Sequence, residues 1–153
     1  MEEIEKHSRI EFEERYNQPC YLKITKDDGC FFEGVSNCTP RISLGMGCRD
    51  FGTVLHELMH AIGFEHEHNR PDRDNYLIIH RENIHPDAKN QFRKLSYNRY
   101  QWIEFEIDYD SVMMYDSYAF SKNNGITIER KDGGIIRRND ILSRMDKAKL
   151  WNL

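Results

Sequence analysis

Residues 56–66 read HELMHAIGFEH, in which three histidines, a glutamate and a glycine form the pattern H-E-x-x-H-x-x-G-x-x-H. A chain of this composition would contain these five fixed positions by chance only about once in ten thousand. Imidazole nitrogens are preferred zinc ligands, and a carboxylate beside them is a common acid–base partner. The stretch therefore predicts a metal site, and the rest of the fold has to bring its three histidines together.

The spacing of the histidines predicts where a helix ends. His56 and His60 stand four residues apart, so one helical face presents both rings to one ion. If the helix continued, His66 would lie ~15 Å further along the axis, whereas zinc–nitrogen bonds measure only ~2.0–2.1 Å. The helix must therefore stop between His60 and His66. Gly63 is the residue that can adopt the left-handed conformation needed to stop it.

Three histidine ligands leave a fourth zinc position open for water, as in catalytic rather than structural sites. Glu57 follows the first ligand, about 100° around the helix. We expect it to take the proton of the zinc-bound water during attack on a peptide carbonyl and to pass that proton to the leaving amine. The alternatives are a histidine-rich surface helix and a zinc site that has lost its activity.

The composition agrees with one globular domain of 153 residues, with 39% hydrophobic residues and a net charge of −4. No excess of basic residues favours nucleic acid or an anionic membrane as a partner. No apolar run reaches the ~20 residues of a transmembrane helix. The first residues, MEEIEKHSRI, are not those of a signal peptide.

Four cysteines, Cys20, Cys30, Cys38 and Cys48, precede the metal motif and permit three pairings. There is no C-x-x-C pair of the kind that a zinc ribbon needs. We therefore expect two disulfides formed in an oxidising compartment rather than free thiols. Asn37-Cys38-Thr39 fits the N-glycosylation sequon, but a proline follows it, and we give it little weight.

Hydrophobic periodicity and turn residues predict strands first, followed by helices and much irregular chain, which is an α+β order. We expect a helix end over residues 1–7, strands over 10–14, 21–25 and 41–44, a turn at 27–29, a helix from Asp50 to about Gly63, a strand over 76–79, a short helix within 87–96, and a last helix from Asn139 or Asp140 to the end.

HELMHAIGFEHEHNRPDRDNY at 56–76 and SVMMYDSYAFS at 111–121 together resemble the zinc signature and the Met-turn of the astacin family of zinc metalloendopeptidases, which belong to the metzincins. The resemblance implies that Met113 lies beneath the zinc site. It also implies that Tyr115 can ligate zinc and then swing to stabilise the transition state. Read alone, both would be ordinary buried residues. Met114 stands where the family usually has histidine.

The resemblance runs nearly end to end and implies the zincin architecture. That architecture has a twisted mixed sheet, long helices above the cleft, and a largely irregular lower half with a C-terminal helix. By the same resemblance Cys30 and Cys48 match a family disulfide, which leaves Cys20 to pair with Cys38, and the protein is expected to be secreted. RISL at 41–44 resembles the upper cleft rim, where an extended substrate adds as a further strand; a plain edge strand is the alternative.

Against the family pattern, the chain begins inside the first long helix, so we read residues 1–153 as a single astacin-like peptidase domain that is incomplete at its N-terminus. The family buries the glutamate after the third histidine near the mature amino terminus. Here that residue is Glu67, and we expect it to lack its partner, which is costly for a buried charge. We therefore expect a fragment of a larger precursor that is poorly stable alone.

The leading functional hypothesis is a secreted, zinc-dependent endopeptidase that cleaves extended protein or peptide segments. The alternatives are an inactive astacin-like binding protein, a non-functional fragment and a structural zinc module.

Arg130, in GITIERKDGG at 125–134, would favour an acidic substrate side chain if it lined a pocket, but a surface turn is the simpler interpretation. We expect His68 to be structural, and Arg70, Asp72 and Asp74 to hold the turn after the metal helix.

Overall fold

The computed structural model describes residues 1–34 and 38–153, so Asn37 of the sequon lies outside the described residues. The chain divides into two compact units, Met1–Phe64 with Asp140–Leu153, and Glu65–Asn139. Both units combine short helices with small sheets, and the fold class is α+β, as the order of elements predicted. No helix in the two described ranges has both the length and the apolar character needed to cross a bilayer.

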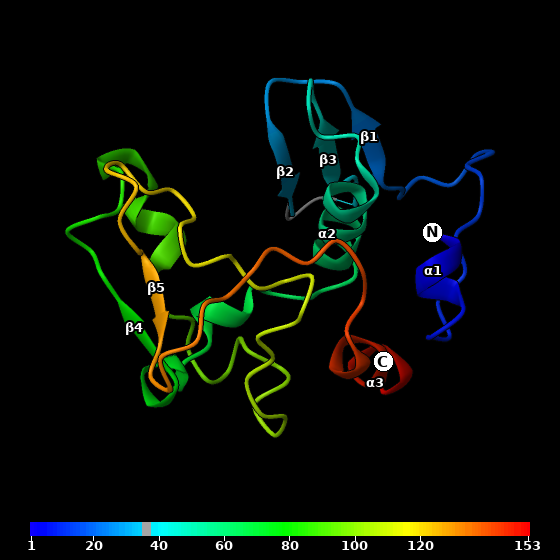
Figure 1. Cartoon of the computed structure of the whole chain (residues 1–153). Coiled ribbons are helices and arrows are strands. Elements are labelled where there is room, and N and C mark those ends of the chain that lie inside the picture. Colours follow the sequence, from blue (N-terminus) through cyan, green and yellow to red (C-terminus); the bar gives the residue numbers. More distant parts are fainter. Residues whose placement is uncertain (35–37) are drawn as a thin grey trace. The chain divides into compact units, whose positions relative to one another are not determined.

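A three-stranded mixed sheet forms the framework of the first unit (Figure 1). Its strands are β1 (Lys23–Thr25), β2 (Cys30–Glu33) and β3 (Arg41–Leu44), in the order β1-β3-β2. β3 pairs in parallel with β1 and antiparallel with β2, so Ile42 has a partner on each side. The expectation that RISL forms an edge is therefore wrong, because both sides of β3 are paired. The outer strands of this sheet are β1 and β2.

In this unit one predicted strand is absent and one observed strand was not predicted. IEFEE at 10–14 alternates like a strand but pairs with no strand in the described part of the chain, and the Phe12 N–H instead donates to the Glu5 carboxylate at 2.9 Å. β2 was not predicted from the sequence. Its extended conformation is set by the register against β3 and by the disulfide at Cys30.

All four cysteines are paired, as Cys20–Cys38 and Cys30–Cys48, which confirms the pairing implied by the family resemblance. The first disulfide joins the segments that enter β1 and β3, and the Tyr21 N–H donates to the Cys38 carbonyl at 2.9 Å. The second joins the start of β2 to the loop after β3. Both disulfides therefore cross-link the small sheet.

Helix α2 (Phe51–Ala61) packs against β2 and β3 and agrees with the predicted helix. Asp50 caps it by accepting from the Thr53 N–H at 3.0 Å and from the Thr53 hydroxyl at 2.7 Å. The helix buries Leu55, Leu58 and Met59 and leaves His56 and His60 partly accessible. The amphipathic pattern therefore fixes which face carries the histidines.

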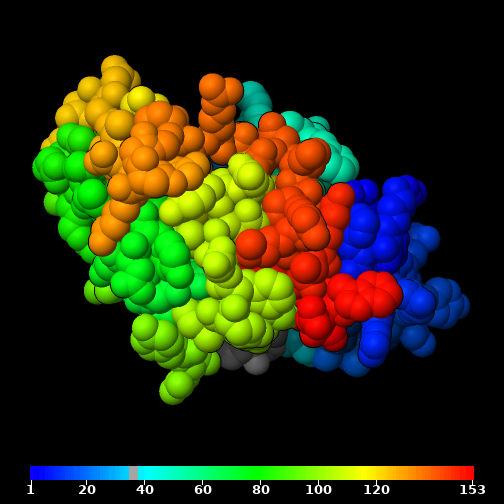
Figure 2. Space-filling model, turned by 60° about the horizontal axis from the view of Figure 1, so that its bottom comes forward, coloured from blue at the N-terminus to red at the C-terminus, as the bar shows by residue number. Residues whose placement is uncertain are grey.

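The chain ends of this unit lie together. α1 (Glu2–Glu5) is one short turn, and α3 (Arg144–Trp151) lies against the N-terminal segment, red beside blue in Figure 2, with Lys147 4.0 Å from Glu3. α3 begins later than predicted because Ser143 and Asp146 form a reciprocal capping box.

The second unit is largely irregular. β4 (Leu77–Ile79) and β5 (Ile128–Arg130) form a two-stranded antiparallel sheet, and η1 (Glu67–Asn69), η2 (Arg73–Asn75) and η3 (Pro86–Phe92) are 3-10 helices. η3 replaces the short helix predicted within 87–96. The core of this unit consists of apolar residues from segments distant in sequence: Leu77, Ile84, Ala88, Phe92, Ile107, Met114, Ile128 and Ile136. Met114 is thus a core residue, which accounts for an apolar side chain at this position.

Gly52 lies close to Asp140 within the first unit, and this contact can be tested by substitution. A Cβ at Gly52 would lie 2.6 Å from the Asp140 Cα and would also overlap the Asp140 side chain. Alanine is the better helix former by about 1 kcal/mol, but overpacking against backbone costs about 1–3 kcal/mol. We expect Gly52→Ala to lower the free energy of unfolding by about 1–2 kcal/mol, measured by urea denaturation. A raised denaturation midpoint would show that the contact is loose.

Candidate metal centre

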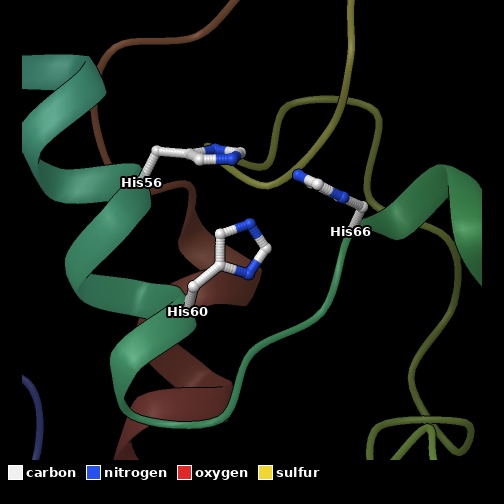
Figure 3. A group of neighbouring side chains, drawn as sticks. All are labelled: His56, His60 and His66. Atoms are coloured by element: carbon white, nitrogen blue, oxygen red, sulfur yellow. The ribbon is translucent and has the colours of Figure 1, made fainter. Parts of the chain in front are cut away.

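The three predicted ligands lie close together. His56 and His60 project from α2, and His66 projects from the segment that follows it, with all three rings turned toward one another (Figure 3). Their ligand atoms lie within 4.8 Å of one another, and they are the only such group of at least three metal-binding side chains among residues 1–34 and 38–153. A tetrahedral zinc ion separates its ligand atoms by ~3.4 Å.

The turn after α2 has the predicted conformation. The helix ends at Ala61, and Gly63 has φ +100°, in the region that favours glycine. The Gly63 N–H donates to the His60 carbonyl, and the Phe64 N–H donates to the Met59 carbonyl, each at 3.0 Å. These bonds satisfy carbonyl groups at the helix end and turn the chain out of the helix before His66.

Neighbouring acceptors orient two of the rings. His60 Nδ1 lies 2.7 Å from the Phe64 carbonyl oxygen, and His66 Nδ1 lies 3.2 Å from Asn69 Oδ1. An amide oxygen can only accept, so each Nδ1 carries the proton and each Nε2 keeps a lone pair for a metal. The Asn69 amide is itself fixed, because its Nδ2 donates to the carbonyls of Gln91 and Arg93.

The electrostatic environment favours neutral ligands. Burial, together with the neighbouring His56, lowers the pKa of His60 to about 4, so this ring is unprotonated at neutral pH. Unprotonated imidazole is the form that binds zinc. The donor set, the tautomers and the protonation state therefore all fit a zinc ion.

Glu57 is the acidic group of this helix. Its side chain is buried, and its Oε2 has no hydrogen-bond partner among the described residues. Burial raises the pKa of Glu57 to about 7. A buried carboxylate without donors costs free energy, and a nearby cation or bound water would offset that cost. Glu57 therefore has the protonation behaviour of a general base or acid.

Tyr115 lies beside one of these histidines, with its ring centroid 4.6 Å from that of His66. Met113, two residues earlier, is buried, and its carbonyl oxygen accepts from the Glu67 N–H at 3.1 Å. The segment that resembles a Met-turn is thus bonded to the residue that follows His66. Spacing within the sequence could not reveal this bond, because Glu67 and Met113 belong to segments far apart along the chain.

The expectation that Glu67 is buried without compensation, for want of the amino-terminal partner, is wrong. Its side chain is buried, and its carboxylate accepts from the Tyr100 hydroxyl at 2.6 Å and from the Asp108 N–H at 3.1 Å. Arg70 Nη1 lies 3.7 Å from the same carboxylate. The charge is therefore compensated within the second unit. Arg70, three residues after Glu67, could have been recognised from the sequence as a partner for its charge. Tyr100 could not, because it lies in a distant segment that contains no recognisable motif.

Arg70, Asp72 and Asp74 form hydrogen bonds and ion pairs in the segment after the third histidine, beyond the turn that ends the metal helix. Arg70 donates to both carboxylate oxygens of Asp72, at 2.9 and 3.0 Å, and to the Phe105 carbonyl at 2.8 Å. Asp74 forms ion pairs with Arg73 and Lys94. These bonds join this segment to the irregular chain that follows it.

Arg130 has an intramolecular partner. Its Nε donates to Asp132 at 2.8 Å, its Nη2 also bonds Asp132, and its guanidinium lies 4.0 Å from the Tyr109 ring centroid. The guanidinium is thus engaged in a turn. The structure favours the surface-turn alternative over a pocket that selects acidic side chains.

Comparisons with known proteins agree with this geometry. The model of the astacin peptidase family matches residues 1–152. The chain is 44% identical to astacin-like metalloprotease toxin 1 of Loxosceles intermedia over 80% of this chain and 47% of that protein. It is also 44% identical to zinc metalloproteinase nas-6 of Caenorhabditis elegans, over 94% of this chain and 43% of that protein. The chain thus spans about half the length of these curated relatives.

A solved structure is similar as well. High choriolytic enzyme 1, a hatching enzyme zinc-protease from Oryzias latipes, superposes with a TM-score of 0.89 at 30% identity, covering 98% of this chain and 76% of that one. The fold is therefore that of the zinc metallopeptidases. Within that class, the chain belongs to the astacin family of peptidases.

The turn at Gly63 can be tested against a matched glycine. A Cβ at Gly63 would meet nothing within 4 Å, so Gly63→Ala adds only the strain of a left-handed L-residue, about 1–2 kcal/mol. We expect that loss of stability together with weaker zinc binding, measured by chelator competition. Gly47→Ala is the control, because Gly47 has φ +84° and equally open surroundings. It should lose similar stability and keep its zinc affinity; equal zinc affinity in both variants would contradict the role of the turn.

Proposed function

We propose that residues 1–153 act as an astacin-like peptidase domain that hydrolyses peptide bonds in proteins, with zinc held by His56, His60 and His66. The burial of Glu57 is the main observation in support of this proposal. Glu57 is a buried carboxylate beside a ligand, and one of its oxygens lacks a hydrogen-bond partner within the described ranges. A scaffold kept only for binding would gain stability by replacing it. Its presence favours a peptidase over an inactive binding protein.

Each step of the proposed hydrolysis is assigned to zinc or to a named side chain. Zinc, when bound, supplies a Lewis acid that polarises a carbonyl and acidifies water. Glu57 accepts a proton from the attacking water at its carboxylate and transfers it to the nitrogen of the leaving amine. The Tyr115 hydroxyl donates a hydrogen bond to the oxygen that becomes negative in the transition state. The proposed ligand His66 and Tyr115 are in ring contact, which supports this division.

An extended substrate has a strand to pair with. β2 is an outer strand of its sheet, and its Phe32 ring stacks near His60, with 6.5 Å between centroids and 14° between planes. A peptide that added to this strand would pass close to a metal ligand. This supports β2, rather than the central β3, as the substrate-binding strand.

The disulfides and the relatives bear on where the protein is located, and Met114 bears on whether it is active. Two disulfides favour an extracellular environment, as do relatives named as a toxin and a hatching enzyme. An inactive astacin-like binding protein is the second candidate, favoured by Met114 where the family has histidine. Measured peptide hydrolysis separates the two.

Replacing the proposed base tests the mechanism. We expect Glu57→Gln to bind one zinc per chain and to lose peptidase activity, because ligand and base are separate residues. Metal analysis and casein hydrolysis would be measured on the same preparations. Glu82→Gln, at an exposed glutamate, is the matched control and should keep full activity. Normal turnover by Glu57→Gln would refute the assigned base.

Replacing the proposed oxyanion donor gives a separate test. We expect Tyr115→Phe to lower kcat by ~10²-fold with little change in KM, because the hydroxyl acts only in the transition state. Tyr118→Phe, at an exposed tyrosine, is the control and should match the wild type. An equal loss of zinc from Tyr115→Phe would mean that the tyrosine serves mainly to hold the metal.

A further inference from the structure

A buried histidine outside the metal cluster packs on Tyr115. His68 is fully buried, and its ring stacks on that of Tyr115 with 4.1 Å between centroids and 24° between planes. The Tyr115 ring also contacts His66, at 4.6 Å, so it touches one histidine of the metal cluster and one outside it. The proposed chemistry needs the Tyr115 hydroxyl at a defined place, so whatever sets the resting position of this ring bears on the rate.

His68 itself is held rigidly. Its Nε2 lies 3.0 Å from the Gln91 carbonyl oxygen, which can only accept, so Nε2 carries the proton. Its own backbone carbonyl accepts from Arg73 Nη1 at 2.6 Å. The Phe92 ring packs against it with 5.4 Å between centroids. The His68 ring is therefore restrained at Nε2, through its backbone and by the Phe92 ring, so it can restrain a ring that stacks on it.

Two further rings bound Tyr115. Phe92 meets the tyrosine edge-on at 6.2 Å, and Phe120 lies 5.6 Å away. Phe120 is 47% exposed, whereas His68 and Phe92 are fully buried. The tyrosine ring therefore contacts two buried rings and one exposed ring, and a buried ring has less freedom to move than an exposed one.

We propose that His68 is a positioning residue for the reaction, whose stacked imidazole sets the resting orientation of the Tyr115 phenol beside His66. The inference rests on the proposed function, because it assigns His68 a role through the Tyr115 hydroxyl. Loss of the stacking ring frees the phenol to adopt unproductive orientations, which lowers kcat without weakening substrate binding.

The first test compares variants at His68 in two backgrounds. His68→Phe keeps a stacking ring and should retain kcat within ~2-fold, whereas His68→Leu should lower kcat by ~10-fold with KM unchanged. In the Tyr115→Phe background, His68→Leu should have no further effect, because the hydroxyl it positions is already gone. An equal fall in both backgrounds would overturn the proposal. If His68→Leu fails to fold, His68→Gln removes the ring and keeps an amide donor near the position of Nε2 for the Gln91 carbonyl.

The second test does not require activity. Fluorotyrosine incorporated at the eight tyrosines gives fluorine resonances, and Tyr115→Phe identifies the one from Tyr115. That resonance should shift in His68→Leu, stay near its wild-type position in His68→Phe, and be unchanged in His85→Leu, a control at an exposed histidine. An unchanged resonance in His68→Leu would overturn the proposal. If the wild type hydrolyses no peptide, the proposed function fails, while this measurement still decides the placement of Tyr115.

Discussion

Three imidazoles from one short stretch have to face a single ion, and an α-helix can supply only two of them. The left-handed Gly63 resolves this constraint by ending α2 soon after His60. Phe64 then serves twice, because its N–H satisfies the helix end and its carbonyl orients the His60 ring. The same local arrangement thus ends the helix and orients a ligand. If the helix continued, His66 would lie further along its axis, away from the other two rings.

The irregular chain around the third histidine is held by side chains rather than by regular secondary structure. Glu67, His68 and Asn69 are all buried and polar, and each bonds to the segment between residues 91 and 108. Buried polar groups need partners, so these bonds restrict the backbone on both sides. The same network orients His66 through Asn69 and places His68 against Tyr115.

The metal helix and three of the five strands were predicted from local signals, whereas two strands and the side-chain contacts with distant segments were missed. The α2 helix and the Gly63 turn follow from nearby residues and were predicted. β2 and β5 were missed, and each pairs with another strand of its sheet; β1, β3 and β4 are equally short but were predicted, over 21–25, 41–44 and 76–79. IEFEE at 10–14 has the right alternation but no partner strand within residues 1–34 and 38–153. The partner of Glu67 was missed because Tyr100 is distant in sequence.

The sequence by itself determined the candidate ligand set, the proposed base and the end of the helix, because metal bond lengths and helical geometry leave few arrangements of H-E-x-x-H-x-x-G-x-x-H. Through resemblance it also indicated the family and the disulfide pairing. Only the tertiary structure decided that β3 is central, that Glu67 is compensated, and that His68 stacks on Tyr115. These features depend on contacts between segments far apart along the chain, which local spacing does not encode.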